Sequence, residues 1–138
     1  MIDTMFPSAF SSYKPRCQKV YGCICMSGEG RILLVKGRMS GKWSLPKGHM
    51  EAWESDLQCA LRELREETQI VPECQYSSYK KFSAGGYFVF FFKDEPTPSC
   101  NGSQEIEEVR WCSVEELDKL KCNVDLNLFK RWLQRSVV

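Results

Sequence analysis

The sequence predicts an α+β fold, and three observations support this prediction. Its 138 residues suffice for one domain with its own core and leave no room for two. Hydrophobic residues make up 43% of the chain and charged residues 27%, which is typical of a soluble globular protein. Strand-like and helix-like segments follow in the order strand, strand, helix, three strands and two helices, and this order indicates helices layered on a sheet.

The first elements are two strands that form a hairpin. Residues 1–17 mix proline, serine and small side chains without periodicity, so we expect a mobile arm there and a single domain over residues 18–138. Residues 19–26 alternate well enough for a strand, and residues 31–36 form the apolar run RILLVK. The Ser-Gly-Glu-Gly turn between these strands predicts that they pair.

An amphipathic helix follows a short extended piece over residues 43–45. The helical pattern begins at Ser55 or Asp56 and ends at Thr68. Apolar side chains recur in it at the spacing i, i+3, i+4 and i+7, which gives the helix one apolar face: Leu57, Ala60, Leu61 and Leu64.

The second half of the chain supplies three strands and two helices. The strands are expected over residues 75–82, 87–92 and 109–112. Ser113 and Glu116 form the capping-box pattern of a helix that ends near residue 121. The last helix is expected over residues 126–135, where one side is apolar: Leu126, Phe129 and Leu133.

Composition excludes several classes of function. Lysine and arginine number 19 against 18 aspartates and glutamates, so the chain lacks a general basic coat for nucleic acid, although a local patch is compatible with these counts. The single histidine, His49, argues against a Ser-His-Asp triad or a histidine-rich metal site. No apolar run approaches the roughly 20 residues of a membrane span, and the first residues lack the pattern of a secretory signal. We therefore expect a cytoplasmic protein with no membrane partner, whose eight cysteines are reduced thiols; the sequence makes no prediction of oligomeric state.

Three glutamates of the predicted helix point to one face. Glu63, Glu66 and Glu67 have the spacing i, i+3 and i+4. Carboxylates this close repel one another unless a cation lies between them, and a hard cation such as Mg²⁺ or Mn²⁺ suits an all-oxygen set of ligands. For the helix taken alone, a solvated acidic face is the alternative. Arg62 can pair with Glu66 at i+4 or reach back to Glu54 and hold the preceding loop over the helix.

These glutamates belong to a longer pattern, G-x5-E-x7-R-E-U-x-E-E-x-G-U, where U is a bulky aliphatic residue. The chain matches eight of its nine fixed positions: Gly48, Glu54, Arg62, Glu63, Leu64, Glu66, Glu67 and Ile70. This run resembles the signature of the Nudix hydrolase family. The resemblance implies a Nudix fold, with a mixed β-sheet sandwiched between α-helices, and a Mg²⁺-dependent hydrolysis (with Mn²⁺ as the alternative ion) of a nucleoside diphosphate linked to another group.

The chain departs from the pattern at Gln69, where the family has glycine. That glycine would end the helix in a left-handed conformation, so glutamine there costs about 1 kcal/mol of backbone strain. The exchange removes no metal ligand. We therefore expect reduced local stability with activity retained.

The resemblance also implies roles for individual residues. Glu66 and Glu67 correspond to the main metal ligands, helped by the backbone carbonyl of Lys47, and Glu63 is either a further ligand or the base that activates water. A further acid from a late loop of the chain corresponds to Glu105, with Glu107 and Glu108 as competitors.

The remaining residues of the expected site bind substrate or shape the motif. Arg62 is placed in the catalytic set, and Lys47 and Arg38 are expected to bind phosphate, because charge-assisted hydrogen bonds suit a polyanion. Gly48 and His49 lie where phosphates would be, and His49 either contacts phosphate or caps the loop. The residues expected to shape the motif are Gly48, Glu54, Leu64 and Ile70.

The predicted substrate is the 5′ cap of mRNA, cleaved to release m7GDP. The run W-x-x-P-K-G that begins at Trp43 resembles both diadenosine tetraphosphate hydrolases and decapping enzymes, whereas residues 54–68 and the run E-I-x-x-V-x-W from Glu105 look more like decapping enzymes. The alternatives are hydrolysis of diadenosine or other nucleoside polyphosphates, hydrolysis of diphosphoinositol polyphosphates, and a non-catalytic module that binds nucleotide or RNA.

Two sets of side chains are candidates to contact such a substrate. Aromatic rings can stack on a base, although a lone aromatic in a small domain is more often core: Trp53, Phe82 and Tyr87. Basic residues near both ends could hold RNA or merely compensate a helix dipole: Lys14, Arg16, Lys19, Lys130, Arg131 and Arg135.

Overall fold

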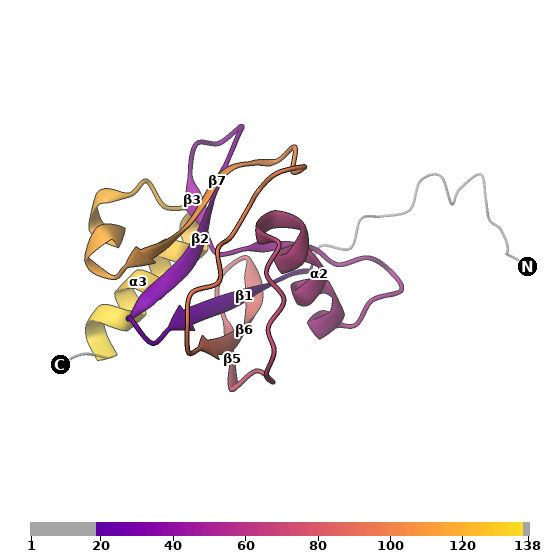
Figure 1. Ribbon diagram of the computed structural model, residues 1–138, viewed down its shortest axis with the longest axis horizontal. Coiled ribbons are helices and arrows are strands. Elements are labelled where there is room, and N and C mark those ends of the chain that lie inside the picture. Colours follow the sequence, from indigo (N-terminus) through magenta and orange to yellow (C-terminus); the bar gives the residue numbers. More distant parts are fainter. Residues whose placement is uncertain (1–18, 137–138) are drawn as a thin grey trace, which may run out of the picture.

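The computed structural model describes residues 19–136, so the mobile arm predicted over residues 1–17 lies outside this range. Seven strands form one mixed sheet with helices around it (Figure 1). The strands are β1 (Val20–Ser27), β2 (Arg31–Gly37), β3 (Trp43–Ser44), β4 (Lys47–His49), β5 (Ser78–Lys81), β6 (Gly85–Phe92) and β7 (Ile106–Ser113). The helices are α2 (Asp56–Thr68), the 3₁₀ helix η1 (Glu115–Lys119) and α3 (Val124–Ser136).

β1 lies at the centre of the sheet, whose strand order is β3-β2-β1-β6-β5. β4 pairs with the start of β1, and β7 pairs with β2 along its whole length. β1 and β6 are parallel, whereas β1 and β2 are antiparallel. The mixed sheet and the hairpin of the first two strands are therefore confirmed.

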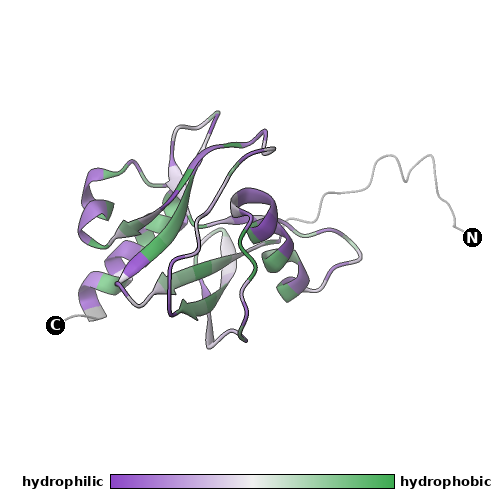
Figure 2. Cartoon of the chain, in the orientation of Figure 1, coloured by the Kyte–Doolittle hydropathy of each residue, from purple (hydrophilic) through white to green (hydrophobic). Residues whose placement is uncertain are grey.

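Both faces of the sheet are buried. Each strand contributes to both, because its successive side chains point to opposite faces. On β1, Cys23 and Cys25 pack towards Ala60 and Leu64 of α2. Ile24, between them, belongs to the cluster that packs on α3. The expected sandwich of a sheet between helices is confirmed, and Figure 2 shows green strands between helices that are part green and part purple.

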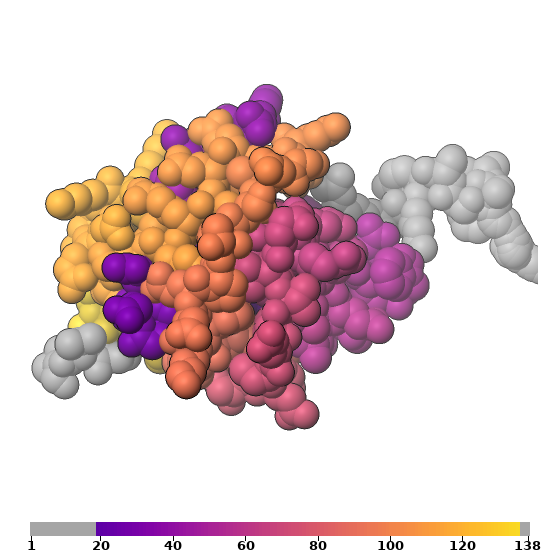
Figure 3. All heavy atoms as spheres, in the orientation of Figure 1, coloured from indigo at the N-terminus to yellow at the C-terminus, as the bar shows by residue number. Residues whose placement is uncertain are grey.

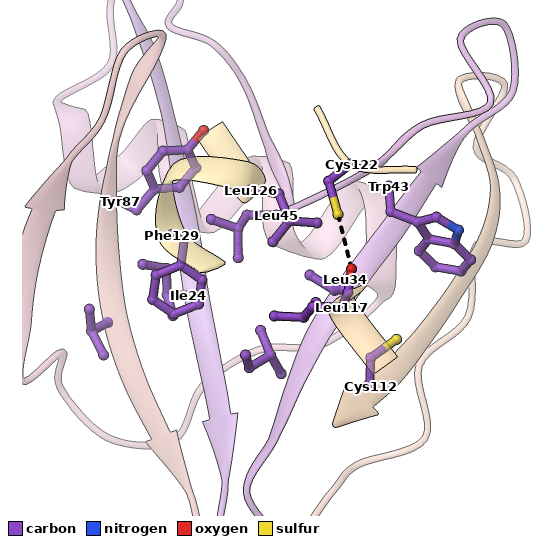
Figure 4. Packing of buried hydrophobic residues seen from close by; sticks show 12 residues of the cluster. Ile24, Leu34, Trp43, Leu45, Tyr87, Cys112, Leu117, Cys122, Leu126 and Phe129 are labelled. Atoms are coloured by element: carbon purple, nitrogen blue, oxygen red, sulfur yellow. Dashed lines mark hydrogen bonds between the residues drawn. The ribbon is translucent and has the colours of Figure 1, made fainter. Parts of the chain in front are cut away.

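The cluster on the α3 side fixes that helix to the sheet. Figure 4 shows Leu126 and Phe129 of α3 beside Tyr87 and Ile24. The Tyr87 hydroxyl donates a hydrogen bond of 2.7 Å to the carboxylate of Asp125, which also accepts one of 2.9 Å from the backbone N–H of Ala84. The first turn of α3 is thereby tied to the start of β6.

Two long connections, residues 69–77 and 93–105, pass over the face of the sheet that carries α2 (Figures 1 and 3). They are held by the backbone N–H of Ser99, which donates to the Thr68 carbonyl at 2.9 Å, and by the Trp111 indole, which donates to the Pro96 carbonyl at 2.9 Å. Within residues 19–136, no helix is long and apolar enough to cross a bilayer.

The prediction for α2 is confirmed at both ends. Ser55 caps the first turn: its hydroxyl accepts from the backbone N–H of Gln58 at 3.1 Å, and the Gln58 side chain accepts from the Ser55 N–H at 2.8 Å. Gln69 ends the helix with φ of 64°, the left-handed conformation expected there. It is the single non-glycine residue with positive φ in the described part of the chain.

Several boundaries predicted from local pattern are wrong. The strand expected over residues 75–82 is limited to Ser78–Lys81, and the one expected over residues 109–112 extends over Ile106–Ser113 because it pairs with β2 throughout. The capping box at Ser113 forms, but it opens a 3₁₀ helix that ends at Lys119.

The thiol prediction is confirmed for the described cysteines. All of them are free, and those that are buried fill the core as small apolar side chains: Cys23, Cys25, Cys59, Cys112 and Cys122.

Candidate active site

A cleft of about 1140 Å³ opens beside the first residues of β1 and the turn before β6. Its walls come from α2, from β4 and its following loop, and from the segments before β3 and β7. The ionisable residues that line it are Lys42, Lys47, His49, Glu51, Glu63, Glu67 and Glu105. Three of these carboxylates, on Glu63, Glu67 and Glu105, are those assigned to catalysis or metal binding from the sequence.

The acidic face of α2 enters this cleft unevenly. Glu67 is the deepest residue at 5% exposure, and its carboxylate accepts a hydrogen bond of 3.3 Å from the backbone N–H of Lys47. The Glu63 side chain is 12% exposed, whereas that of Glu66 is 54% exposed and does not line the cleft. The three carboxylates thus share one helix face at different depths.

Arg62 binds all three neighbouring carboxylates. Its guanidinium donates two hydrogen bonds to the buried carboxylate of Glu54, one of them at 3.1 Å, and others to Glu63 at 3.1 Å and Glu66 at 3.2 Å. A further hydrogen bond of 3.2 Å reaches the His49 carbonyl. Arg62 therefore binds both of the partners considered from the sequence, Glu54 and Glu66. Its contacts hold the loop before α2 over the helix.

Glu54 is ionised in this arrangement. The hydrogen bonds from Arg62 lower the pKa of Glu54 against the opposing effect of its burial, and the backbone N–H of Glu51 donates a further bond of 2.9 Å. The same pair raises the pKa of Arg62 above its usual range. The ion pair is therefore fixed in charge and closes the loop of residues 50–55.

The carboxylates inside the cleft resist ionisation when no cation is near. Burial, together with the neighbouring Glu63, raises the pKa of Glu67 to about 8. Burial also raises the pKa of Glu63 to about 7, while Arg62 lowers it. In the described range no set of three or more His, Cys, Asp or Glu side chains already stands in ligating positions. The fit to a divalent cation therefore rests on the carboxylate oxygen donors, and on the pKa values of Glu63 and Glu67, which a bound cation would lower; such donors suit Mg²⁺ or Mn²⁺.

Gly48 makes room for one of these carboxylates. It lies in the middle of β4, which pairs with β1. A Cβ atom at this position would lie 2.1 Å from the carboxyl carbon of Glu63. The Cys59 thiol donates to the Gly48 carbonyl at 3.6 Å and holds the same strand from α2.

Arg38 holds the segment that carries Glu105. The backbone N–H of Arg38 donates to the Glu105 carbonyl at 2.8 Å, and its guanidinium donates to the carbonyls of Gln104 and Ile106, each at 3.3 Å. Arg38 itself does not line the cleft, unlike the other expected phosphate-binding residues Lys47, Gly48 and His49. The geometry gives Arg38 a positioning role for the segment that carries Glu105.

Glu105, Glu107 and Glu108 differ in location and in the side chains with which they pair. Glu105 lines the cleft. Glu107 pairs with Lys36 at 3.3 Å, and Glu108 pairs with Arg110 at 3.5 Å, both outside the cleft. Geometry thus favours Glu105 over its two competitors.

The aliphatic positions of the motif lie in the core. Leu64 is fully buried and Ile70 is 3% exposed, both in the cluster between α2 and the sheet. Glu54, although charged, is 5% exposed. Leu64 and Ile70 thus pack α2 against the sheet, and Glu54 is buried in the loop before this helix.

Apolar side chains also line the cleft. Met39 is 96% exposed and Trp53 is 69% exposed, and the Trp53 indole donates to the Glu51 carboxylate at 3.2 Å. Of the aromatic candidates, Tyr87 is buried in the core and Phe82 packs against it. Sequence reasoning gave no sign of Met39, which lies in a loop without a motif.

Asn123 is a further cleft residue that was missed. Its side chain accepts from the backbone N–H of Leu126 at 2.9 Å, so it caps the start of α3. The signal was present in the sequence, since asparagine before an apolar helical pattern is a preferred cap. Placing the helix start at residue 126 hid it.

Comparison with known proteins identifies the family of this chain. A model of the NUDIX domain matches residues 18–133. The chain therefore belongs to the NUDIX domain family.

Its relatives include decapping enzymes. Over 123 aligned residues it is 42% identical to "mRNA-decapping enzyme subunit 2" of Arabidopsis thaliana. This alignment covers 84% of this chain and 33% of that protein. It is 29% identical to "m7GpppN-mRNA hydrolase" of Saccharomyces cerevisiae over 80% of this chain and 12% of that protein. The chain thus spans a third or less of the length of these relatives. Among solved structures, a C. elegans Ap4A hydrolase in a binary complex superposes with a TM-score of 0.67 at 21% identity, covering 86% of this chain and 97% of that one.

Proposed function

We propose that this chain is a Mg²⁺-dependent pyrophosphohydrolase that cleaves the 5′ cap of mRNA and releases m7GDP. One observation carries the chemistry: Glu63, Glu67 and Glu105 line a single cleft together with Lys47 and Gly48. The similarity to decapping proteins, which reaches 42% identity over most of the chain, supports the choice of substrate. The expected cytoplasmic location accords with this function and stays a prediction.

The carboxylates of the cleft and of the adjoining face of α2 have different roles. Glu67 and the more exposed Glu66 would hold Mg²⁺ together with the Lys47 carbonyl, and Glu63 would be either a further ligand or the base. When bound, the ion supplies charge neutralisation at the diphosphate and lowers the pKa of water. Glu63 or Glu105 accepts the proton of the attacking water, since both are carboxylates in the same cleft.

Other residues of the cleft bind the rest of the substrate. The Lys47 ammonium is positioned to pair with phosphate, and Trp53 offers an exposed ring for a base to stack on. The hydrogen bond from its indole to Glu51 holds that ring in one orientation. A stacked base near the carboxylates orients the diphosphate that follows it.

The test is hydrolysis of cap-labelled RNA with and without Mg²⁺, with cap dinucleotide and diadenosine tetraphosphate assayed in parallel. We expect release of m7GDP from capped RNA, and we expect Glu67→Gln to abolish it while the melting temperature changes little. Glu115→Gln, an exposed glutamate on η1, is the matched control and should retain full activity. Preferred cleavage of diadenosine tetraphosphate would reassign the substrate, and an active Glu67→Gln protein would refute the assigned metal ligand.

A further inference from the structure

The active-site cleft continues into a second hollow with a different charge. This hollow has a volume of about 200 Å³. Its lining residues are Lys19, Val20, Tyr21, Lys81, Ala84, Gly85 and Gly86. Val20 and Ala84 line both the hollow and the cleft. A molecule bound at the carboxylates can therefore extend past these two residues while it stays in contact with the protein.

The register of the sheet shows how the two hollows are related. His49 of β4 pairs with Val20 of β1, Val20 pairs with Gly85 of β6, and Gly86 pairs with Lys81 of β5. Neighbouring strands lie about 4.8 Å apart, so β6 lies about 10 Å and β5 about 14 Å from the catalytic strand β4. The hollow is thus the next stretch of surface along the same edge of the sheet.

Two lysines give this hollow its charge. Lys19, just before β1, and Lys81, at the end of β5, are both exposed and flank the Gly85–Gly86 segment from either side. Within residues 19–136 neither lysine forms an ion pair. The backbone of Gly85 and Gly86 lies between them, and the side chains of Val20 and Tyr79 lie against these two glycines.

The position of Lys19 is also tied to the catalytic loop. Its backbone carbonyl accepts a hydrogen bond of 3.0 Å from the N–H of Met50, the residue after β4. The ammonium of Lys19 therefore projects from a segment that is anchored beside Gly48 and His49. By contrast, the basic residue Lys130 of α3 is already paired with Asp118 at 3.7 Å.

We propose that Lys19 and Lys81 bind a phosphate of the part of the substrate that extends beyond the scissile diphosphate. The inference rests on the proposed function and deepens it: in a capped RNA this phosphate is a phosphodiester of the transcript. The substrate is a polyanion, and different phosphates of it would bind in the acidic cleft, which needs a cation, and in the basic hollow beside it. The reacting phosphates lie at the carboxylates, and the following phosphate lies between the two lysines.

The test compares a Lys19→Ala/Lys81→Ala double variant with the wild type on capped RNA, cap dinucleotide and diadenosine tetraphosphate. With capped RNA of several tens of nucleotides, the KM rises while kcat is unchanged. With cap dinucleotide, which ends before the hollow, the KM stays the same. The matched control is Lys93→Ala/Lys119→Ala, which removes two exposed lysines away from the hollow.

Salt dependence gives a second measurement. Removing one lysine–phosphate interaction lowers the slope of log affinity against log salt by about 0.7 for a single strand, so two such interactions account for about 1.4. The affinity ratio of wild type to double variant for RNA then shrinks about sevenfold between 50 and 200 mM salt. An unchanged slope, or an equal rise in KM on cap dinucleotide, would overturn the proposal.

Two further experiments identify the source of the phosphate. They also distinguish a failure of this inference from a failure of the proposed function. If the double variant has a raised KM for diadenosine tetraphosphate but not for capped RNA, the phosphate site stands and its ligand is a polyphosphate chain. Binding of labelled uncapped RNA to a Glu67→Gln protein needs no turnover. If wild-type protein leaves caps intact but the lysine pair still contributes to this binding, the hollow stands and the decapping proposal fails. If the lysines contribute to neither binding nor KM, the hollow is refuted whatever the enzyme cleaves.

Discussion

Substitution of Gly48 by alanine should separate catalysis from folding. The backbone of Gly48 is outside the positive-φ region, so alanine is not strained there. Its Cβ, however, would lie 2.1 Å from the carboxyl carbon of Glu63 and 2.2 and 2.4 Å from the two carboxylate oxygens. Carbon atoms in contact need about 3.5 Å, so the Glu63 carboxylate must retreat by roughly 1.4 Å.

That retreat affects rate far more than stability. The carboxylate ends a flexible side chain, and the retreat breaks its 3.1 Å hydrogen bond with Arg62, so the free energy of unfolding should fall by no more than about 1–2 kcal/mol. A displacement of about 1 Å in a catalytic group can cost about 100-fold in rate. We therefore expect kcat to fall roughly 100-fold with the fold retained.

The assay pairs Mg²⁺-dependent release of m7GDP with urea denaturation of the same protein. Gly28→Ala is the matched control. Its Cβ would lie 3.1 Å from the Lys93 carbonyl oxygen and would contact none of the carboxylates of the site. A Gly48→Ala protein with wild-type kcat would refute the argument that Glu63 must keep its place. A protein that unfolds would show that the Glu63 carboxylate cannot move away without disrupting the fold.

Two further predictions concern stability. Because the pKa values of Glu67 and Glu63 rise to about 8 and about 7 from an ordinary 4.5, folding takes up protons, and metal-free protein should lose stability as the pH rises from about 5 to 8. Urea denaturation should show this decline reduced in Glu67→Gln and reduced by Mg²⁺; a flat profile in wild-type protein would contradict it. Gln69→Gly should stabilise the protein by about 1 kcal/mol because φ is 64° there, whereas Gln134→Gly within α3 should destabilise it. A destabilised Gln69→Gly protein would show that the glutamine side chain contributes more than its backbone costs.

The parts of the site that follow from helical periodicity could be predicted from the sequence. Spacing alone puts Glu63 and Glu67 on one face. The left-handed helix end at Gln69 was expected from the glycine that the Nudix pattern has at this position, and the φ of 64° confirms it. The difference in depth between Glu66 and Glu67 could not be predicted in this way. It depends on where β4 and the segment before β7 lie, and both are brought there by pairing with distant strands.

The same reason explains the errors in the strands. Residues 106–108 contain two adjacent glutamates and look like a loop, yet they are strand because Ile106 and Glu108 pair with Gly37 and Lys36 of β2, with an irregularity in the register at Glu107. Glu107 and Glu108 are tolerated there, since each is exposed and finds a basic partner, Lys36 or Arg110. Pairing of this kind is non-local, and a window of the sequence does not contain it.

Arg62 shows why one motif carries both the fold and the chemistry of this site. Its two hydrogen bonds to buried Glu54 close the loop of residues 50–55, while its remaining donors reach Glu63, Glu66 and the His49 carbonyl. If Glu66 turns from Arg62 towards a cation, Glu54 still holds the guanidinium, so the loop stays closed while the carboxylates change partner. A lysine could not do both, because a single ammonium lacks the planar fork that binds one carboxylate with two N–H groups and leaves others free. The motif therefore requires arginine at this position for geometry, beyond its need for positive charge.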